Sequence, residues 1–393
     1  MFYLQYFGIL SSRFLEMLES KTTVSMIKEL FTAFSLIAAA NESSEAISMP
    51  WRPQEPQGAI PYEEEEVKYS NITADITLAG TLTLPRSRKP SPAVLLIAGS
   101  GPVDRDETVF GHKPFLVLAD HLTKQGIVVL RIDKRGIGQS TGNYEVSTSE
   151  DFAADILAGV EYLKTRTEVD AEKIGLIGHS EGGLIAPLVA VKSKDVAFIV
   201  LMAAQGVTGE TLVYTQETLI SRSMGVSEEQ ISHQLDFQKQ VLSIIINEPD
   251  IEKAEKLIRE IVTKQLVKLP QEEQQANANA MEAQIKRCNS KWFRYFLTYD
   301  PRTSLEHLKI PVLAINGELD FQVPPKQNLY LIGKILKEAG NQNYKITEFP
   351  KLNHFFQTCE SGSILEYGKI EETIAPIVLD TLSDWILETT THR

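Results

Sequence analysis

The segment GHSEGG at 178–183 places Ser180 in a G-x-S-x-G pattern, between the apolar run KIGLI and a helix-forming stretch. A tight turn from a buried strand into a helix exposes the serine hydroxyl at the carboxyl edge of a sheet, where it can attack a carbonyl carbon. The strand and helix backbones approach closely at such a turn, and Gly178 and Gly182 lack the Cβ atoms that would clash there. The pattern therefore predicts Ser180 as the nucleophile of an acyl-transfer reaction.

A serine hydroxyl attacks efficiently at neutral pH only when a base takes its proton and an acidic group orients that base. With a turn of this type, the three residues follow in the order serine, acid, histidine. Asp320 follows the apolar run PVLAI and His354 follows the β-rich run YKITEF, so we expect both beyond the carboxyl ends of strands. Glu318 is an alternative acid. His307 is an alternative base, but it precedes its strand and would lie at the opposite sheet edge.

The negative charge that develops on the substrate oxygen requires backbone N–H donors. We expect one donor from Glu181, the residue after the nucleophile, and a second from the loop GSGP. In that loop Ser100 is the first choice and Gly101 the alternative, and one such donor lowers the barrier by about 3 kcal/mol. Arg105 follows in the same loop, within DRDE, and we expect it to brace the site through ion pairs. Contact with a substrate carboxylate is the alternative role of Arg105.

Short apolar runs alternate with helix-forming stretches through most of the chain. Such runs indicate strands buried on both faces, and their alternation with helices indicates a mostly parallel sheet covered on both sides. We expect an antiparallel pair within 66–85 to open the sheet. The other expected strands lie at 93–98, 127–132, 173–177, 196–202, 311–315 and 344–348, and the expected helices at 115–125, 149–165, 184–191 and 374–388.

The sheet pattern is interrupted by a charged, helix-forming region at 206–308. Because the sheet pattern resumes directly after it, we interpret this region as a helical cap inserted into the core. The core itself is then expected at 63–205 and 309–393. Residues 49–62 are rich in proline and predict an extended linker.

The N-terminal segment 1–48 contains the apolar stretch LFTAFSLIAAA, which follows Lys28 and precedes polar residues. Its length and flanks are typical of a signal peptide within about 26–40. We therefore favour export to the periplasm or the extracellular space. An amphipathic N-terminal helix that packs on the body of a cytoplasmic protein is the alternative.

The composition of the 393 residues is that of an ordinary globular chain, with 43% hydrophobic and 23% charged residues. The formal net charge of −13 argues against nucleic acid as a partner, because phosphate binding needs a basic face. No apolar stretch has the length of a membrane span, and nothing in the pattern predicts an oligomeric state. Cys288 and Cys359 lack metal-ligand spacing, so we expect packing thiols, or a single bridge if the protein is exported.

Six segments together resemble bacterial α/β-hydrolases related to the serine aminopeptidase S33 group, and most nearly the EstD-type carboxylesterases. These segments are LLIAGSGPVDRDE, GHKPF, LRIDKRGIGQSTG, GHSEGG, NGELDFQVPP and LNHFFQ. The resemblance covers about residues 52–385. It implies an α/β-hydrolase fold with a helical cap, a triad of Ser180, Asp320 and His354, an oxyanion loop at 99–101, an export signal and activity on short acyl esters.

The resulting hypothesis is a serine esterase that acts on a small-molecule ester and needs no metal or organic cofactor. A serine aminopeptidase, an amidase or a thioesterase would use the same three residues. A binding protein that keeps the fold is the remaining alternative, and we do not favour it because every member of the triad is present in the expected order.

Overall fold

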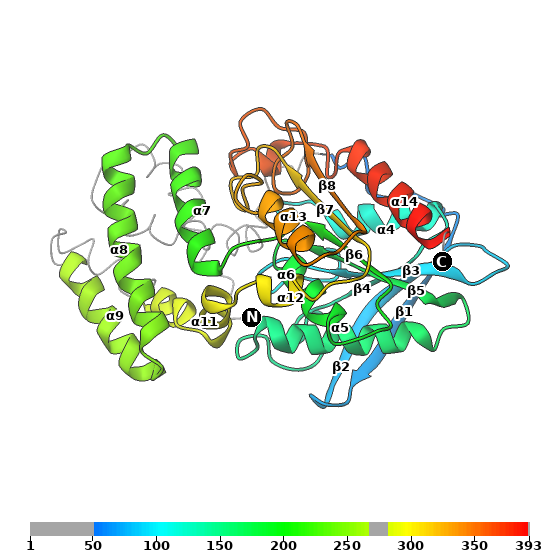
Figure 1. The fold of residues 1–393 in the computed structure, drawn as a ribbon, viewed down its shortest axis with the longest axis horizontal. Coiled ribbons are helices and arrows are strands. Elements are labelled where there is room, and N and C mark those ends of the chain that lie inside the picture. The colour runs from blue at the N-terminus through cyan, green and yellow to red at the C-terminus, as the bar shows by residue number, and fades with distance from the viewer. Residues whose placement is uncertain (1–50, 267–281, 392–393) are drawn as a thin grey trace. The chain divides into compact units, whose positions relative to one another are not determined.

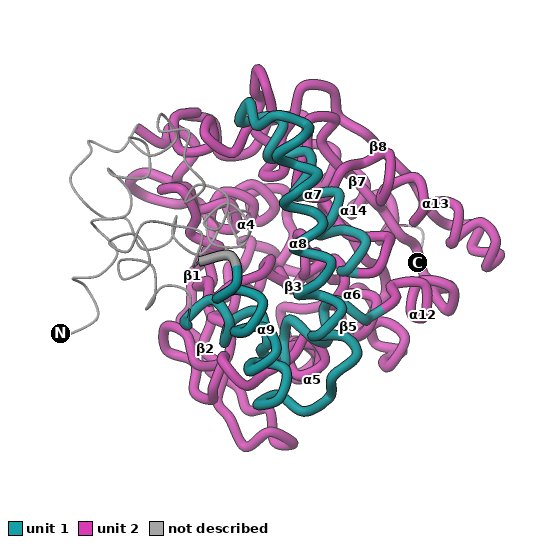
Figure 2. Tube along the Cα trace, turned by 90° about the vertical axis from the view of Figure 1, so that its left-hand side faces the viewer, with its two compact units in different colours: residues 1–48, 209–299 teal, residues 49–208, 300–393 magenta. Residues whose placement is uncertain are grey.

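The computed structural model describes residues 51–266 and 282–391. The N-terminal segment 1–48, with the signal peptide predicted at 26–40, lies outside the described residues. The described chain forms two compact units, which Figure 2 shows in different colours. Among the described residues, we call 209–299 the helical unit, and 51–208 with 300–391 the sheet unit.

The sheet unit is built on one open sheet of eight strands (Figure 1). The strands are β1 (Glu63–Asn71), β2 (Ile76–Leu84), β3 (Ser91–Ile97), β4 (Val128–Ile132), β5 (Val169–His179), β6 (Phe198–Met202), β7 (Val312–Gly317) and β8 (Tyr344–Phe349). Their order across the sheet is β1-β2-β4-β3-β5-β6-β7-β8. The β1–β2 and β2–β4 pairs are antiparallel and all other neighbours are parallel. This arrangement confirms the predicted mostly parallel sheet with an antiparallel opening pair.

Helices cover both faces of the sheet. They are α4 (Pro114–Lys124) and α14 (Pro376–Thr391) on one face, and α5 (Ser149–Lys164), α6 (Glu181–Ala190) and α13 (Leu329–Glu338) on the other. Val94 and Leu96 of β3 share a buried apolar cluster with α4 and α14. Leu95 points to the opposite face, where Gly159 of α5 lies so close that a Cβ would overlap the leucine side chain. Both faces of the central strands are therefore buried, which explains their continuous apolar sequences.

Local signals fix where the helices begin. Pro114 stands at the start of α4, where its missing N–H has no intrahelical partner to lose. Thr148 and Asp151 form a reciprocal capping box at the start of α5. Helix α13 is a covering helix that the sequence periodicity did not identify, although it buries Leu329, Ile332 and other apolar residues.

The proline-rich segment before β1 is tied to the sheet unit. Residues 51–62 form no helix or strand, and the Arg52 side chain is buried among backbone carbonyls. Its guanidinium donates to the carbonyl oxygens of Phe110 (3.2 Å), Gly111 (3.2 Å), Gly368 (2.9 Å) and Ile370 (2.5 Å). One side chain thus joins this segment to two loops that are far apart in sequence.

The described helical unit consists of α7 (Gly209–Ser223), α8 (Glu228–Asn247), α9 (Ile251–Leu266), residues 282–288 in helical conformation and α11 (Lys291–Thr298). In α9 the buried residues Ala254, Ile258 and Val262 are spaced by four, as expected for an amphipathic helix. The short helix α12 (Arg302–Leu305) belongs to the sheet unit. That the region at 206–308 acts as a cap stays a prediction.

The two cysteines are free and buried, as expected for packing thiols. Burial raises the pKa of the Cys288 thiol to about 12 and that of Cys359 to about 11. None of the described helices combines the length and the apolar character that crossing a bilayer requires. Within 51–266 and 282–391, no group of three or more His, Cys, Asp or Glu side chains is arranged to hold a metal ion.

Candidate active site

Ser180 lies on a strained turn between β5 and α6. Its backbone has φ of 53° and ψ of −116°, a conformation that non-glycine residues rarely adopt. The flanking glycines permit this turn, since a Cβ at Gly178 would overlap the carbonyl of Gly182, and a Cβ at Gly182 would overlap the carbonyl of Ile97. The elbow predicted from G-x-S-x-G is therefore present, with Ser180 half-buried at its tip.

Asp320 and His354 are paired in the structure. Asp320 follows β7 and His354 follows β8, and the His354 Nδ1 atom lies 2.8 Å from Asp320 Oδ2. The other carboxylate oxygen, Oδ1, accepts hydrogen bonds from the backbone N–H groups of Gln322 and Val323, both at 2.8 Å. Both side chains of the pair are almost fully buried. The carboxylate is thus held in one orientation before it meets the imidazole.

The two alternatives raised by the sequence lie elsewhere. Glu318 accepts a hydrogen bond from the backbone N–H of Lys351 (3.1 Å) and has no contact with the His354 ring. His307 is exposed, and its Nδ1 atom lies 3.0 Å from the carbonyl oxygen of Thr303. The geometry therefore brings Asp320, and not Glu318, to His354.

Ser180, Asp320 and His354 all follow carboxyl ends of parallel strands, so they share one edge of the sheet. Within the described chain, Ser180 Oγ forms no hydrogen bond to His354 Nε2. Such bonds are commonly long without substrate and tighten when substrate binds. The structure thus pairs His354 with Asp320 and places Ser180 at the same edge of the sheet.

The loop after β3 lies against the nucleophile. A Cβ at Gly99 would stand 3.2 Å from the Ser180 Cβ atom, and Gly101 has φ of 105°. The N–H of Gly99 donates to Glu107 Oε1 (2.5 Å), so the next two amides, those of Ser100 and Gly101, are the candidate donors to an oxyanion. Glu181 is the first residue of α6, where amides point out of the helix and favour negative charge.

A buried hydrogen-bond chain joins this loop to the histidine loop. Glu107 Oε1 lies 3.0 Å from His179 Nδ1, and His179 Nε2 lies 3.1 Å from the carbonyl oxygen of His354. Both ring nitrogens of His179 therefore face acceptors, which favours the protonated ring. Burial lowers the pKa of His179, but the charge and hydrogen bond of Glu107, the hydrogen bond to the His354 carbonyl and the charge of Asp320 together raise it above its ordinary value. The sequence singled out neither His179 nor Glu107.

Arg105 has the bracing contacts that the sequence predicted. Its guanidinium pairs with Asp133 Oδ2 (2.8 Å) and Glu66 Oε2 (2.6 Å) and donates to Thr81 Oγ1 (2.7 Å). The hydrogen bonds that Arg105 donates to Asp133 raise the pKa of the Arg105 guanidinium, so its charge is permanent. These contacts connect the loop after β3 to β1, β2 and the loop after β4.

A small cavity lies beside His179 and Glu107. Its other walls are apolar: Pro114, Phe115, Leu118, Met202, Phe355, Phe356 and Ile374. Ser180 is not among its lining residues, so this cavity is not the place where substrate meets the nucleophile.

The comparisons with known proteins agree with this geometry. Residues 113–358 match the family described as Serine aminopeptidase, S33. Esterase EstD of Thermotoga maritima is 29% identical over 318 residues, which cover 80% of this chain and 67% of that protein. Two solved structures share the fold: the Pyrococcus furiosus esterase Pf2001, with a TM-score of 0.52, and DcsB in complex with its substrate analogue, with 0.53.

Both structures are 16% identical in sequence to this chain. The match to Pf2001 covers 88% of this chain and 98% of that protein, and the match to DcsB covers 83% and 99%. A structural likeness at this sequence identity shows the fold alone. The family match spans more than half of the chain and therefore shows the family. The chain therefore belongs to the serine aminopeptidase S33 family of α/β-hydrolases.

Proposed function

We propose that this protein is a serine esterase that hydrolyses carboxylic esters through an acyl-enzyme intermediate. The observation that carries the proposal is the buried His354–Asp320 hydrogen bond of 2.8 Å at the sheet edge that also bears the strained Ser180 elbow. This combination supplies a nucleophile, a base and an orienting acid. The likeness to Esterase EstD supports an ester as substrate.

In the proposed reaction, the Ser180 hydroxyl attacks the ester carbonyl carbon while His354 Nε2 takes its proton. The Asp320 carboxylate keeps the proton of the imidazole on Nδ1 and stabilises the imidazolium that forms. The N–H groups of Ser100 and Glu181 donate to the oxyanion, with Gly101 as the alternative to Ser100. His354 then returns the proton to the leaving alcohol, and a water molecule hydrolyses the acyl-serine by the same steps.

We further propose short-chain acyl esters as the preferred substrates, on the strength of the resemblance to EstD-type carboxylesterases. The experiment measures p-nitrophenol release from acetate, butyrate, octanoate and palmitate esters by the wild type and by Ser180→Ala. We expect turnover that is highest on the short esters and absent in Ser180→Ala, with unchanged thermal unfolding. Turnover that survives in Ser180→Ala would refute the mechanism.

A peptidase is the second candidate, because the matching family is described as a serine aminopeptidase. Aminoacyl p-nitroanilides separate the two reactions in the same assay. Cleavage of the anilides without cleavage of the esters would replace the esterase proposal with an aminopeptidase. A folded protein whose Ser180 does not react with a fluorophosphonate probe would instead be a binding protein.

A further inference from the structure

Lys134 is a buried cation that the proposed reaction does not use. It follows β4, and its side chain is 7% exposed. The ammonium group donates to the carbonyl oxygen of Gly99, lies 3.5 Å from Glu181 Oε2, and stands 5.1 Å from the centre of the Phe152 ring. A buried ammonium group is costly unless it is paired, so contacts of this kind hold it in one place.

The contact between Lys134 and the Gly99 carbonyl oxygen also affects the N–H group of the next residue, Ser100. The Gly99 carbonyl and the Ser100 N–H belong to one planar peptide unit, so fixing the oxygen also fixes the direction of the N–H. A cation on the carbonyl oxygen also polarises the amide and strengthens its N–H as a donor. Ser100 N–H is the first-choice donor to the oxyanion, and Lys134 therefore bears directly on its position and strength.

Gly99 needs such a restraint because glycine allows its two flanking peptide units to rotate freely. Glu107 holds the N–H on one side of Gly99 at 2.5 Å, and Lys134 holds the carbonyl on the other side. Two side chains of opposite charge, from different loops, thus clamp the peptide units before and after this residue.

The same ammonium group faces the residue that carries the second donor. Glu181 Oε1 accepts a hydrogen bond from Ser149 Oγ at 2.7 Å, and Glu181 Oε2 points toward Lys134. The Glu181 side chain is almost fully buried, so these contacts tie the first turn of α6 to the Lys134 loop. Lys134 thus contacts both Gly99 and Glu181 through its charged group.

We infer that Lys134 is a positioning residue of the oxyanion hole, which aligns and polarises the Gly99–Ser100 peptide and couples it to the Glu181 amide. The inference rests on the proposed function, since an oxyanion hole matters only if acyl transfer occurs. It is distinct from a role in stability alone, because it predicts a loss of transition-state stabilisation without a matching loss of substrate binding.

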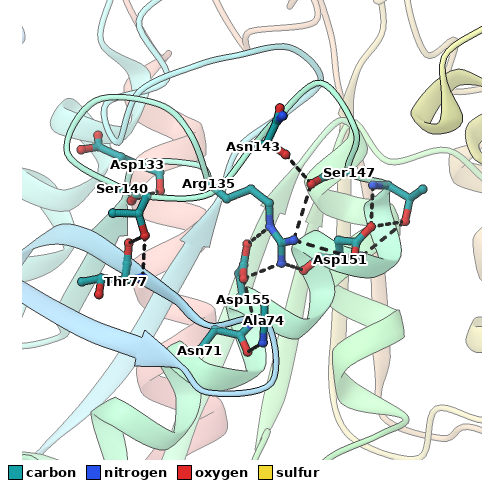
Figure 3. A network of polar contacts seen from close by, with 12 residues as sticks. Asn71, Ala74, Thr77, Asp133, Arg135, Ser140, Asn143, Ser147, Asp151 and Asp155 are labelled. Carbon is teal, nitrogen blue, oxygen red and sulfur yellow. Dashed lines mark hydrogen bonds and ion pairs between the residues drawn. The ribbon is translucent and has the colours of Figure 1, made fainter.

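The test compares Lys134→Met with Arg135→Met. Arg135 is the next residue, is equally buried, and pairs with Asp155 (2.6 Å), and it also donates to the carbonyl of Asp151 (2.7 Å). Figure 3 shows this network, and none of its labelled residues belongs to the loop after β3 or to the elbow. Loss of either cation removes a charged neighbour of a buried carboxylate, so both variants report general structural damage, and only Lys134→Met reports on the oxyanion hole.

We expect Lys134→Met to lower kcat by about 10- to 100-fold, while KM changes by less than about threefold. The inhibition constant of a trifluoromethyl ketone, which forms a tetrahedral adduct on the serine, should rise by the same factor as kcat/KM falls. Arg135→Met should lower the unfolding temperature without lowering kcat. Lys134→Gln, which can still donate to Gly99 but carries no charge, should retain more activity than Lys134→Met.

The inference fails if Lys134→Met retains wild-type kcat, or if both Met variants lose kcat in proportion to their loss of stability. Should Lys134→Met not fold, Lys134→Gln and Lys134→Arg carry the same comparison. Absence of ester turnover by the wild type defeats the proposed function instead. In that case the rate of Ser180 labelling by a fluorophosphonate, which also develops an oxyanion, still decides the role of Lys134.

Discussion

The two halves of the site are constructed differently. In the acid–base half, after β7 and β8, the proposed reacting groups are the side chains of Asp320 and His354, and backbone N–H groups hold Asp320 in place. In the oxyanion half, at the loops after β3 and β4, the proposed donors are backbone amides, and the charged side chains of Glu107 and Lys134 contact the peptide groups of Gly99 beside them. A substitution in the first half removes a proposed reacting side chain. A substitution in the second half shifts a backbone N–H donor without removing it.

The largest effect is expected for Asp320→Asn in the acid–base half. The amide keeps the shape of the carboxylate, but it favours the wrong imidazole tautomer, and we expect kcat to fall by about 10⁴-fold. The measurement is steady-state ester hydrolysis, with thermal unfolding to show that the fold is intact. Glu318→Asn is the matched control, since Glu318 follows the same strand and its carboxylate accepts a hydrogen bond from the Lys351 amide. An equal loss in the control would show that the geometry does not identify the acid.

A smaller effect is expected for Glu107→Gln in the oxyanion half. The side-chain oxygen can still accept from Gly99, but His179 loses its negative partner. The new NH₂ group would replace Glu107 Oε2, which is buried without a hydrogen-bond partner among the described residues. We expect a loss of about 1–3 kcal/mol in unfolding free energy and a fall in kcat of about 10-fold. Urea denaturation and ester hydrolysis measure the two effects.

The control for that variant is Glu64→Gln, which removes a half-exposed partner of Arg131. It should leave kcat unchanged. If Glu107→Gln loses stability but keeps wild-type kcat, the buried chain through His179 supports only the fold, and the oxyanion loop holds its shape without it.

The contrast between the halves also explains what the sequence could predict. Ser180, Asp320 and His354 are the proposed reacting groups, and residue type, chain order and position after apolar runs were enough to predict them. The central strands are likewise evident, because burial on both faces requires continuous apolar sequence. Glu107 accepts from the Gly99 N–H, and Lys134 donates to the Gly99 carbonyl oxygen. No spacing in the sequence predicts contacts of this kind.

The ends of strands and helices were predicted less well than their centres, because contacts with residues distant in sequence also determine where these elements begin. Strand β5 begins at Val169, four residues before the expected start, because Val169 pairs with Ser91 of β3 ahead of an irregularity, and regular pairing resumes only at Ile174. Helix α6 begins at Glu181, although glycines that usually disfavour helices occupy its first turn. Close packing against Ile97 and Ala204 outweighs that local preference.

Two buried histidines should make the stability of the fold change with pH in opposite directions. Burial lowers the pKa of His112 to about 4; its Nε2 lies 3.0 Å from the Tyr367 carbonyl oxygen and its Nδ1 lies 2.9 Å from Thr373 Oγ1. As the pH falls, His112 is protonated in the unfolded chain before it is protonated in the folded protein. Its contribution to stability is therefore complete above about pH 6.5 and is lost as the pH falls toward about 4. The pKa of His179 is raised, so its contribution is complete below about pH 6.5 and is lost as the pH rises through its folded pKa.

We therefore expect the stability difference between wild type and His112→Gln to be larger at about pH 7.5 than at about pH 5, by at most about 3 kcal/mol. The difference between wild type and His179→Gln should be larger at about pH 6 than at about pH 9. Urea denaturation at each pH measures both. The same sign of change for both variants would contradict the assignment of opposite shifts.

The smallest effect is expected where the oxyanion half reaches the surface. Arg105 links Asp133, whose side chain is 4% exposed, to Glu66, whose side chain is 64% exposed. Water screens the outer pair, so Glu66→Gln should cost less than about 1 kcal/mol of unfolding free energy and leave kcat unchanged. Asp133→Asn, which breaks the inner pair, should cost more. If Glu66→Gln nevertheless lowers kcat, the amides of the oxyanion loop depend on exposed charges at the protein surface as well as on the buried charges.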